Sequence, residues 1–165
     1  MTDLPAAAPP TPGDSSPGEQ PTSGRIEAGA HVLPVRVYYE DTDFTGLVYH
    51  ARYLQFLERG RSDFLRLLGV EHARLLERPE PLVFAVRRMV IDYLSPARID
   101  DALQVRSQFK EARGARLTIE QGIERAGATL VTAEVEAVCM TLDGKPRRAP
   151  KDIAERFAAV AASAG

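Results

Sequence analysis

The sequence predicts an α+β fold in which one five-stranded antiparallel sheet wraps around one long central helix. Three observations support this prediction. A strand-like alternation is followed directly by a helical pattern over residues 49–68, and four strand-like runs then come in series. The turns between these later runs are too short for crossover helices, so neighbouring strands must be antiparallel. The length of 165 residues fits one domain.

The first 29 residues differ in composition from the rest of the chain. Residues 1–29 hold six of the 12 prolines and almost no large apolar side chain. Such a segment cannot bury enough surface to offset its ordering entropy. We therefore expect a disordered tail at 1–29 and one folded domain at 30–165, with His31 solvated at their boundary. Alternation of apolar and polar residues predicts the first strand at about 32–39.

The long helix is predicted from apolar residues spaced by three, four and seven positions. The stripe consists of Tyr53, Phe56, Leu57, Phe64 and Leu68, and it is widened by Leu54, Leu65 and Leu67. Gly69 is a plausible end, because glycine commonly follows the last helical turn. At 1.5 Å per residue the helix is about 30 Å long, which is enough to span a sheet.

The remaining strands are expected at four apolar or alternating runs, followed by one amphipathic helix at 150–162. These runs are residues 82–94, 102–111, 115–125 and 129–142. The breaks "SPARIDD", "RG", "AGA" and "DGKP" are typical of turns. An open sheet of this size leaves a free edge, and such edges are usually paired or protected. We therefore expect a homodimer or homotetramer.

Composition restricts the functional classes. The net charge is −2, and without the tail the chain has 20 basic and 19 acidic residues, so no nucleic-acid partner is expected. The sequence contains no run of 18 apolar residues, so no membrane span is expected. The N-terminus also lacks the pattern of a secretory leader. The single cysteine, Cys139, is expected in the core. Together these features favour a cytoplasmic protein.

A cluster of polar side chains lies where the first strand meets the long helix. Glu40, Asp41, Asp43 and His50 fall within "YYEDTDFTGLVYH". A helix start exposes unpaired N–H groups and a partial positive charge, which suit an oxygen that becomes anionic during a reaction. A carboxylate beside such N–H groups is suited to acyl transfer. The alternative is that these acids only cap the helix, and Asp41 and Thr42 are expected to be structural caps or turn formers.

Three segments carry a resemblance to a known family. They are "RVYYEDTDFTGLVYHARYLQFLERGRSDFLR", "VRRMVIDYLSPARIDDAL" and "KPRRAPKDI". They resemble the YbgC branch of the 4-hydroxybenzoyl-CoA thioesterase family, which has the hotdog fold, over residues 32–157. The resemblance implies hydrolysis of a short-chain or aromatic acyl-CoA, or of an acyl group on acyl carrier protein. It implies no cofactor, because coenzyme A is part of the substrate, and it suggests a link to the Tol-Pal envelope system.

The same resemblance assigns the catalytic residues. The catalytic aspartate is the second in D-x-D-x-x-G, which is Asp43, and the oxyanion donor is the backbone N–H at His50, with Tyr49 beside it. We expect the thioester carbonyl to accept hydrogen bonds from the N–H groups of both Tyr49 and His50. Asp43 attacks the thioester directly or activates water, and burial in a dimer cleft is expected to raise its pKa. The branch often has small residues where this chain has Phe44 and Thr45, which bears on the acyl pocket.

Further residues are candidates for substrate binding. Glu58 lies two helical turns beyond His50 and is a second candidate carboxylate; its alternative role is an ion pair with Arg61. Arginines suit the phosphates of coenzyme A. The basic turn "KEARGAR" and one apolar strand supply Lys110, Arg113, Arg116, Arg87 and Arg88. The turn could equally be a solvated hairpin. No spacing typical of metal ligands is present, so no metal is expected.

Two other functions remain open. A hotdog dehydratase acting on hydroxyacyl thioesters would use a histidine with an acid, as His50 and Glu58 could, but the His-Phe-Pro-Gly sequence of those enzymes is absent. A non-catalytic scaffold that binds acyl-CoA or acyl carrier protein is the other alternative, since fold does not fix function. Asp43 argues against the scaffold.

Overall fold

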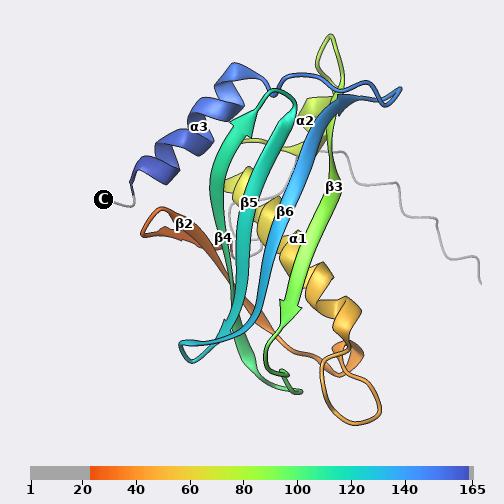
Figure 1. Ribbon diagram of the computed structural model, residues 1–165, viewed down its shortest axis with the longest axis vertical. Coiled ribbons are helices and arrows are strands. Elements are labelled where there is room, and N and C mark those ends of the chain that lie inside the picture. The colour runs from red at the N-terminus through yellow and green to blue at the C-terminus, as the bar shows by residue number, and fades with distance from the viewer. Residues whose placement is uncertain (1–22, 164–165) are drawn as a thin grey trace, which may run out of the picture.

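The computed structural model describes residues 23–163 and contains a six-stranded, fully antiparallel sheet in the order β1-β2-β4-β5-β6-β3. The strands are β1 (Arg25–Glu27), β2 (Ala30–Arg36), β3 (Leu82–Tyr93), β4 (Ala102–Arg113), β5 (Arg116–Arg125) and β6 (Ala128–Thr141). The helices are η1 (Tyr39–Asp41), α1 (His50–Leu67), α2 (His72–Leu76) and α3 (Lys151–Ala162). Figure 1 shows the sheet curving around α1, as the sequence predicts, with α3 and the loop before α1 at opposite ends of the molecule.

The sheet packs on α1 through alternate residues of each strand. On β4 the buried positions are Leu103, Val105, Ser107 and Phe109, which are the positions predicted from the alternation. A side chain on a strand points to the opposite face from its neighbour, so one row of each strand covers the helix. Cys139 on β6 is fully buried, as expected.

The prediction of five strands is wrong by one. β1 lies within residues 1–29, which were expected to be a tail, and it pairs with β2 through a turn at Ala28 and Gly29. Both turn residues have positive φ, 47° and 70°, and this conformation matches the twist of a tight hairpin. Three paired residues leave almost no apolar alternation in the sequence, which explains why the strand was missed. Residues 1–22 of the predicted tail lie outside the described residues.

The hairpin also corrects the expectation for His31. This side chain is fully buried rather than solvated. Its Nε2 hydrogen-bonds Asp63 Oδ2 at 2.8 Å, and its ring stacks on Phe64 with centroids 5.4 Å apart. Gly24 N donates to the same Asp63 oxygen at 2.7 Å, so the N-terminal hairpin is tied to α1.

α1 is less buried than its apolar pattern suggested. Phe56 and Leu57 are completely buried and Phe64 nearly so, but Leu54 and Leu67 are 38% and 41% exposed. At 100° per residue Leu54 and Leu67 lie about 140° apart around the helix axis, so they do not form one exposed side, and neither is covered in a single copy. At Gly60 α1 lies close to β4, because an added Cβ would lie 2.7 Å from Val105 Cγ1.

Candidate active site

The segment before α1 forms a small hairpin that carries the predicted catalytic groups. An isolated bridge joins Thr42 to Val48, and Asp43 N donates to Leu47 O at 2.9 Å. Gly46 closes the turn with a φ of +77°, a conformation that favours glycine. Asp43 therefore lies on the first arm, while the second arm runs directly into the start of α1.

Asp43 is exposed, and its carboxylate is held by Thr45. The Thr45 hydroxyl donates to Asp43 Oδ1 at 2.5 Å and the Thr45 amide donates to the same oxygen at 2.8 Å. The hydroxyl bond, followed by the amide bond, lowers the pKa of Asp43 below its ordinary value. In a single copy this direction is opposite to the expected rise through burial. The carboxylate is thus ionised at neutral pH, and it does not cap α1.

The start of α1 has no side-chain cap. Tyr49 is the N-cap residue without a capping hydrogen bond, and the first turn contains no acid. The Tyr49 N–H donates to the carbonyl of Asp41 at 3.0 Å, so this amide is already used and the predicted pair of donors reduces to one. Within residues 23–163 no acceptor is found for the His50 N–H, as is usual for the first residue of a helix.

Aromatic rings surround the His50 position. The His50 ring lies 4.4 Å from the Tyr49 ring and 6.4 Å from the Tyr93 ring, measured between centroids. The Tyr93 hydroxyl donates to the His50 carbonyl at 3.2 Å. An open hollow of about 270 Å³ adjoins this end of the helix, lined by His50, Tyr53, Tyr93, Leu94, Ser95 and Pro96. A flexible thioester arm could therefore reach the helix start.

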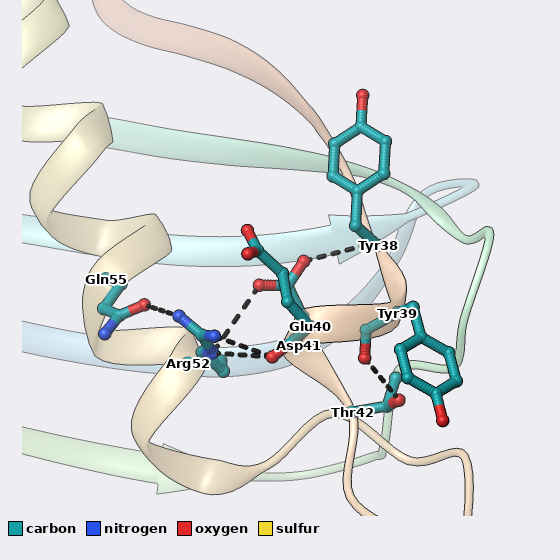
Figure 2. Close-up of polar contacts among 7 residues, drawn as sticks. All are labelled: Tyr38, Tyr39, Glu40, Asp41, Thr42, Arg52 and Gln55. Carbon is teal, nitrogen blue, oxygen red and sulfur yellow. Dashed lines mark hydrogen bonds and ion pairs between the residues drawn. The ribbon is translucent and has the colours of Figure 1, made fainter. Parts of the chain in front are cut away.

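The other polar residues of the turn are structural, as expected (Figure 2). Asp41 Oδ2 accepts a hydrogen bond from Tyr38 N at 2.8 Å, and the Thr42 hydroxyl donates to the Tyr39 carbonyl at 3.0 Å. These bonds stabilise η1. Asp41 and Thr42 therefore stabilise the turn at η1 and do not cap α1, and Asp43 does not cap α1 either.

Glu58 lies further along α1 and makes neither of the contacts considered for it. Its Oε1 accepts from the Ser62 hydroxyl at 2.5 Å, while Arg61 donates to Gln121 Oε1 at 2.8 Å. Eight residues separate His50 from Glu58, which is about 12 Å along a helix. In a single copy Glu58 therefore does not share a site with the helix start.

Glu58 instead lines a mostly apolar pocket of about 140 Å³ between α1 and the sheet. Its walls are Glu58, Arg61, Ser62, Phe64, Leu65, His72, Phe84, Ala85, Val86, Leu117, Ile119, Ala137 and Phe157. The sequence does not predict this pocket, because its walls come from elements far apart in the chain. The apolar run at residues 82–94 was the only available signal.

Most of the predicted phosphate-binding arginines are already paired. Arg87 forms an ion pair with Glu136, Arg116 lies 3.8 Å from the same carboxylate, and Arg88 lies 3.6 Å from Glu134. Arg87 is the main cause of the lowered pKa of Glu136. Arg113 is exposed and makes no ion pair within the part of the chain that the structure describes.

Residues 23–163 contain no group of three or more histidine, cysteine or acidic side chains placed to hold a metal ion. In the same range, no helix is both long and apolar enough to cross a membrane.

Comparison with known proteins assigns the fold to a class. The family model described as "Thioesterase-like superfamily" matches residues 37–157. A crystal structure of a probable thioesterase from Bartonella henselae is 46% identical, with a TM-score of 0.71, and the match covers 73% of this chain and 99% of that one. A thioesterase from Thermus thermophilus, solved with coenzyme A and Zn, is 25% identical, with a TM-score of 0.68 over 79% of this chain and 93% of that one. The architecture is therefore that of the hotdog thioesterases.

A relative of named function identifies the branch. The acyl-CoA thioesterase YbgC of Haemophilus influenzae is 44% identical over 126 residues, which are 76% of this chain and 92% of that protein. The chain belongs to the YbgC family of the thioesterase-like superfamily. The prediction of a YbgC-type thioesterase is thereby confirmed.

Proposed function

We propose that the protein hydrolyses acyl-CoA thioesters to the free acid and coenzyme A, with Asp43 as the catalytic carboxylate. One observation carries this proposal: a single hairpin bears an ionised, exposed carboxylate on one arm and leads into an uncapped helix start on the other. A carboxylate used for capping would not be available for chemistry. The thioesterase names of the relatives support the same reaction class.

The proposed reaction needs few groups. The thioester carbonyl oxygen accepts the His50 N–H, and the helix dipole stabilises the negative charge that develops on it. Asp43 either attacks the carbonyl carbon, giving a mixed anhydride that water then cleaves, or removes a proton from the attacking water. The thiolate of coenzyme A leaves as the C–S bond breaks. Tyr49 contributes its ring beside His50 and not its N–H, which Asp41 occupies.

A second copy of the chain would complete this site. β3 is an edge strand of 12 residues, and Val86 and Val90 on it are 48% and 41% exposed. Pairing two β3 edges about a two-fold axis would join the sheets and place the two α1 helices antiparallel. The pocket beside Glu58 in one copy would then approach the α1 start of the other. A Val90→Lys variant should yield monomers in light scattering and lose activity.

The pocket beside Glu58 is the proposed acyl site. Apolar cavities of about 150 Å³ accept a benzene-sized group, and this pocket measures about 140 Å³. We therefore expect benzoyl and short aliphatic acyl groups to be better substrates than long chains. Phe44, which is 99% exposed and adjacent to Asp43, adds apolar surface near the reacting carbon.

Arg113 is the proposed contact for the phosphates of coenzyme A. Arg87, Arg88 and Arg116 already face glutamates, so binding a phosphate through them would first disrupt those pairs. Arg113 carries no such cost, and a guanidinium suits bidentate phosphate contacts.

Acyl groups on acyl carrier protein remain a second possible substrate, and the link to Tol-Pal remains a proposal from family resemblance alone.

A substrate panel tests the proposal and its alternatives. The wild-type protein is incubated with acetyl-, isobutyryl-, hexanoyl-, benzoyl- and palmitoyl-CoA, with 3-hydroxybutyryl-CoA and with hexanoyl-acyl carrier protein. Release of free thiol indicates hydrolysis. Formation of a double bond on the hydroxyacyl substrate would indicate a dehydratase, and binding without any product would indicate a scaffold. Either of these last two results would refute the thioesterase proposal.

Two variants assign the carboxylate. Asp43→Asn keeps an acceptor for Thr45 and should retain fold and acyl-CoA binding, but kcat should fall by about 10²–10⁴, the range for loss of a catalytic acid or base. Glu58→Gln is the matched comparison on the pocket wall and should retain most activity. The reverse pattern would transfer the catalytic role to Glu58.

A further inference from the structure

Arg52 links the turn before α1 to the helix itself (Figure 2). Its Nε and Nη2 atoms donate to the Glu40 carbonyl at 3.1 and 2.7 Å, and Nη1 donates to Gln55 Oε1 at 2.5 Å. The Arg52 side chain is 28% exposed, so water competes only partly for these bonds. One guanidinium on the first turn of α1 thus holds η1 against the helix.

Asp41 lies beside this guanidinium and is almost fully buried, with 2% of the residue exposed. Its Oδ2 accepts the Tyr38 amide, but Oδ1 has no hydrogen-bond partner within residues 23–163. The Nε of Arg52 lies 3.7 Å from Oδ1. A buried carboxylate is costly unless a cation balances it, so the stability of this turn depends on Arg52.

The backbone of Asp41 connects this pair to the helix start. Its carbonyl accepts the Tyr49 N–H at 3.0 Å. His50, the proposed oxyanion donor, follows Tyr49 directly, and Asp43 follows Asp41 by two residues. A shift of Asp41 would therefore change the spacing between the Asp43 carboxylate and the His50 N–H, because these lie on the two arms that Asp41 and Tyr49 join.

We infer that Arg52 and Asp41 are positioning residues of the thioester hydrolysis: together they fix the hairpin so that Asp43 and the His50 N–H face one carbonyl group. Neither residue needs to touch the substrate. The inference rests on the proposed function and extends it to a second layer of residues. Its physical basis is that a displacement of about 1 Å at a reacting centre can reduce the rate by about 100-fold.

The test separates kcat from KM. With the acyl-CoA of the panel that gives the highest kcat/KM, Arg52→Ala should lower kcat by about 10- to 100-fold while KM changes by less than about threefold. Asp41→Asn should lower kcat by a similar factor. The double variant should be no worse than the more impaired single variant, because residues that act as one unit are not additive.

Two variants make the comparison specific. Arg59→Ala removes an arginine from the same helix that lies over the Phe56 ring and not near the turn, and it should keep kcat within about twofold, as expected for a surface change. Arg52→Lys keeps the charge but loses the forked donor geometry, so about a three- to tenfold loss in kcat is expected with an unchanged near-UV circular dichroism spectrum. This variant decides the question if Arg52→Ala does not fold.

Three outcomes would overturn the inference. The first is wild-type kcat in both Arg52→Lys and Arg52→Ala. The second is a rise in KM of Arg52→Ala at constant kcat. The third is a loss of kcat in the double variant that equals the sum of the two single losses in free energy. The second outcome would make Arg52 a substrate-binding residue. A wild-type protein that releases no thiol from any substrate would refute the proposed function as well, whereas an active wild type with unaffected variants refutes this inference alone.

Discussion

Substitution of Gly60 tests whether α1 is seated on β4 as closely as the structure places it. A Cβ at this position would lie 2.7 Å from Val105 Cγ1 and 3.0 Å from Ser107 Oγ. Both neighbours are fully buried, and the branched Val105 side chain has little rotamer freedom. The added methyl group therefore cannot be accommodated by a simple rotation.

Helix propensity and core packing predict changes of opposite sign in the free energy of unfolding. Alanine is about 1 kcal/mol better than glycine in a helix, whereas overpacking a core costs about 1–3 kcal/mol. Gly60→Ala should therefore lower the free energy of unfolding by about 1 kcal/mol, and Gly60→Val, which adds more volume, by about 3 kcal/mol. For a chain of this size each kcal/mol corresponds to a Tm change of about 2–4 °C.

The assay is denaturant unfolding followed by circular dichroism at one fixed protein concentration, because an oligomer has a concentration-dependent stability. Arg59→Ala, at the neighbouring exposed position, should change the free energy of unfolding by less than about 0.5 kcal/mol. The expected stability order is Gly60, then alanine, then valine. If Gly60→Ala is instead more stable than wild type by about 1 kcal/mol, helix propensity dominates and the close contact with β4 does not exist.

Three other predictions concern pH and substrate binding. Burial lowers the pKa of His31 despite its bond to Asp63. The unfolded chain therefore takes up a proton on His31 before the folded chain does as pH falls below about 6.5, and the free energy of unfolding should fall in that window. When unfolding is measured at pH 7.5 and 5.5, the difference between the two values should be smaller in His31→Gln than in the wild type. Thr45→Val removes the main cause of the lowered pKa of Asp43, so the acidic limb of the kcat/KM profile should move to higher pH, and an unmoved limb would contradict the role of Thr45. Arg113→Ala should raise KM for acyl-CoA about tenfold with little change in kcat, as loss of one charge-assisted contact predicts. As a control, the wild type and Arg113→Ala should have equal KM for an acylated pantetheine, which lacks the nucleotide.

The sequence predicted the elements whose apolar periodicity is strong. The four later strands and the two longer helices lie where the alternation and the three-four spacing placed them, with ends within a few residues. β1 was missed because three residues cannot show a period. His31 was misjudged for the same reason, since its burial depends on the hairpin that β1 forms over it and on Asp63 more than thirty residues away.

The sequence indicated candidate residues for the site but not the bonds that they make. The motif identified Asp43 and the helix start, yet the sequence could not tell which acid caps and which remains exposed. That distinction depends on Thr45, which holds Asp43, and on the burial of Asp41. The role of Tyr49 was also out of reach, because a backbone N–H leaves no trace in the residue type. Arg52 gave no signal, since an arginine on the first turn of a helix is usually a surface residue.

The distribution of polar and apolar features along α1 supports the proposed second copy of the chain. The groups suited to the chemistry lie at the first residue of the helix, whereas the pocket suited to an acyl group begins at Glu58, about 12 Å further along. A single substrate must contact both, but one copy separates them. In the proposed two-fold dimer, an antiparallel pair of α1 helices would remove this separation. The β3 edge and the divided site would then have one common explanation.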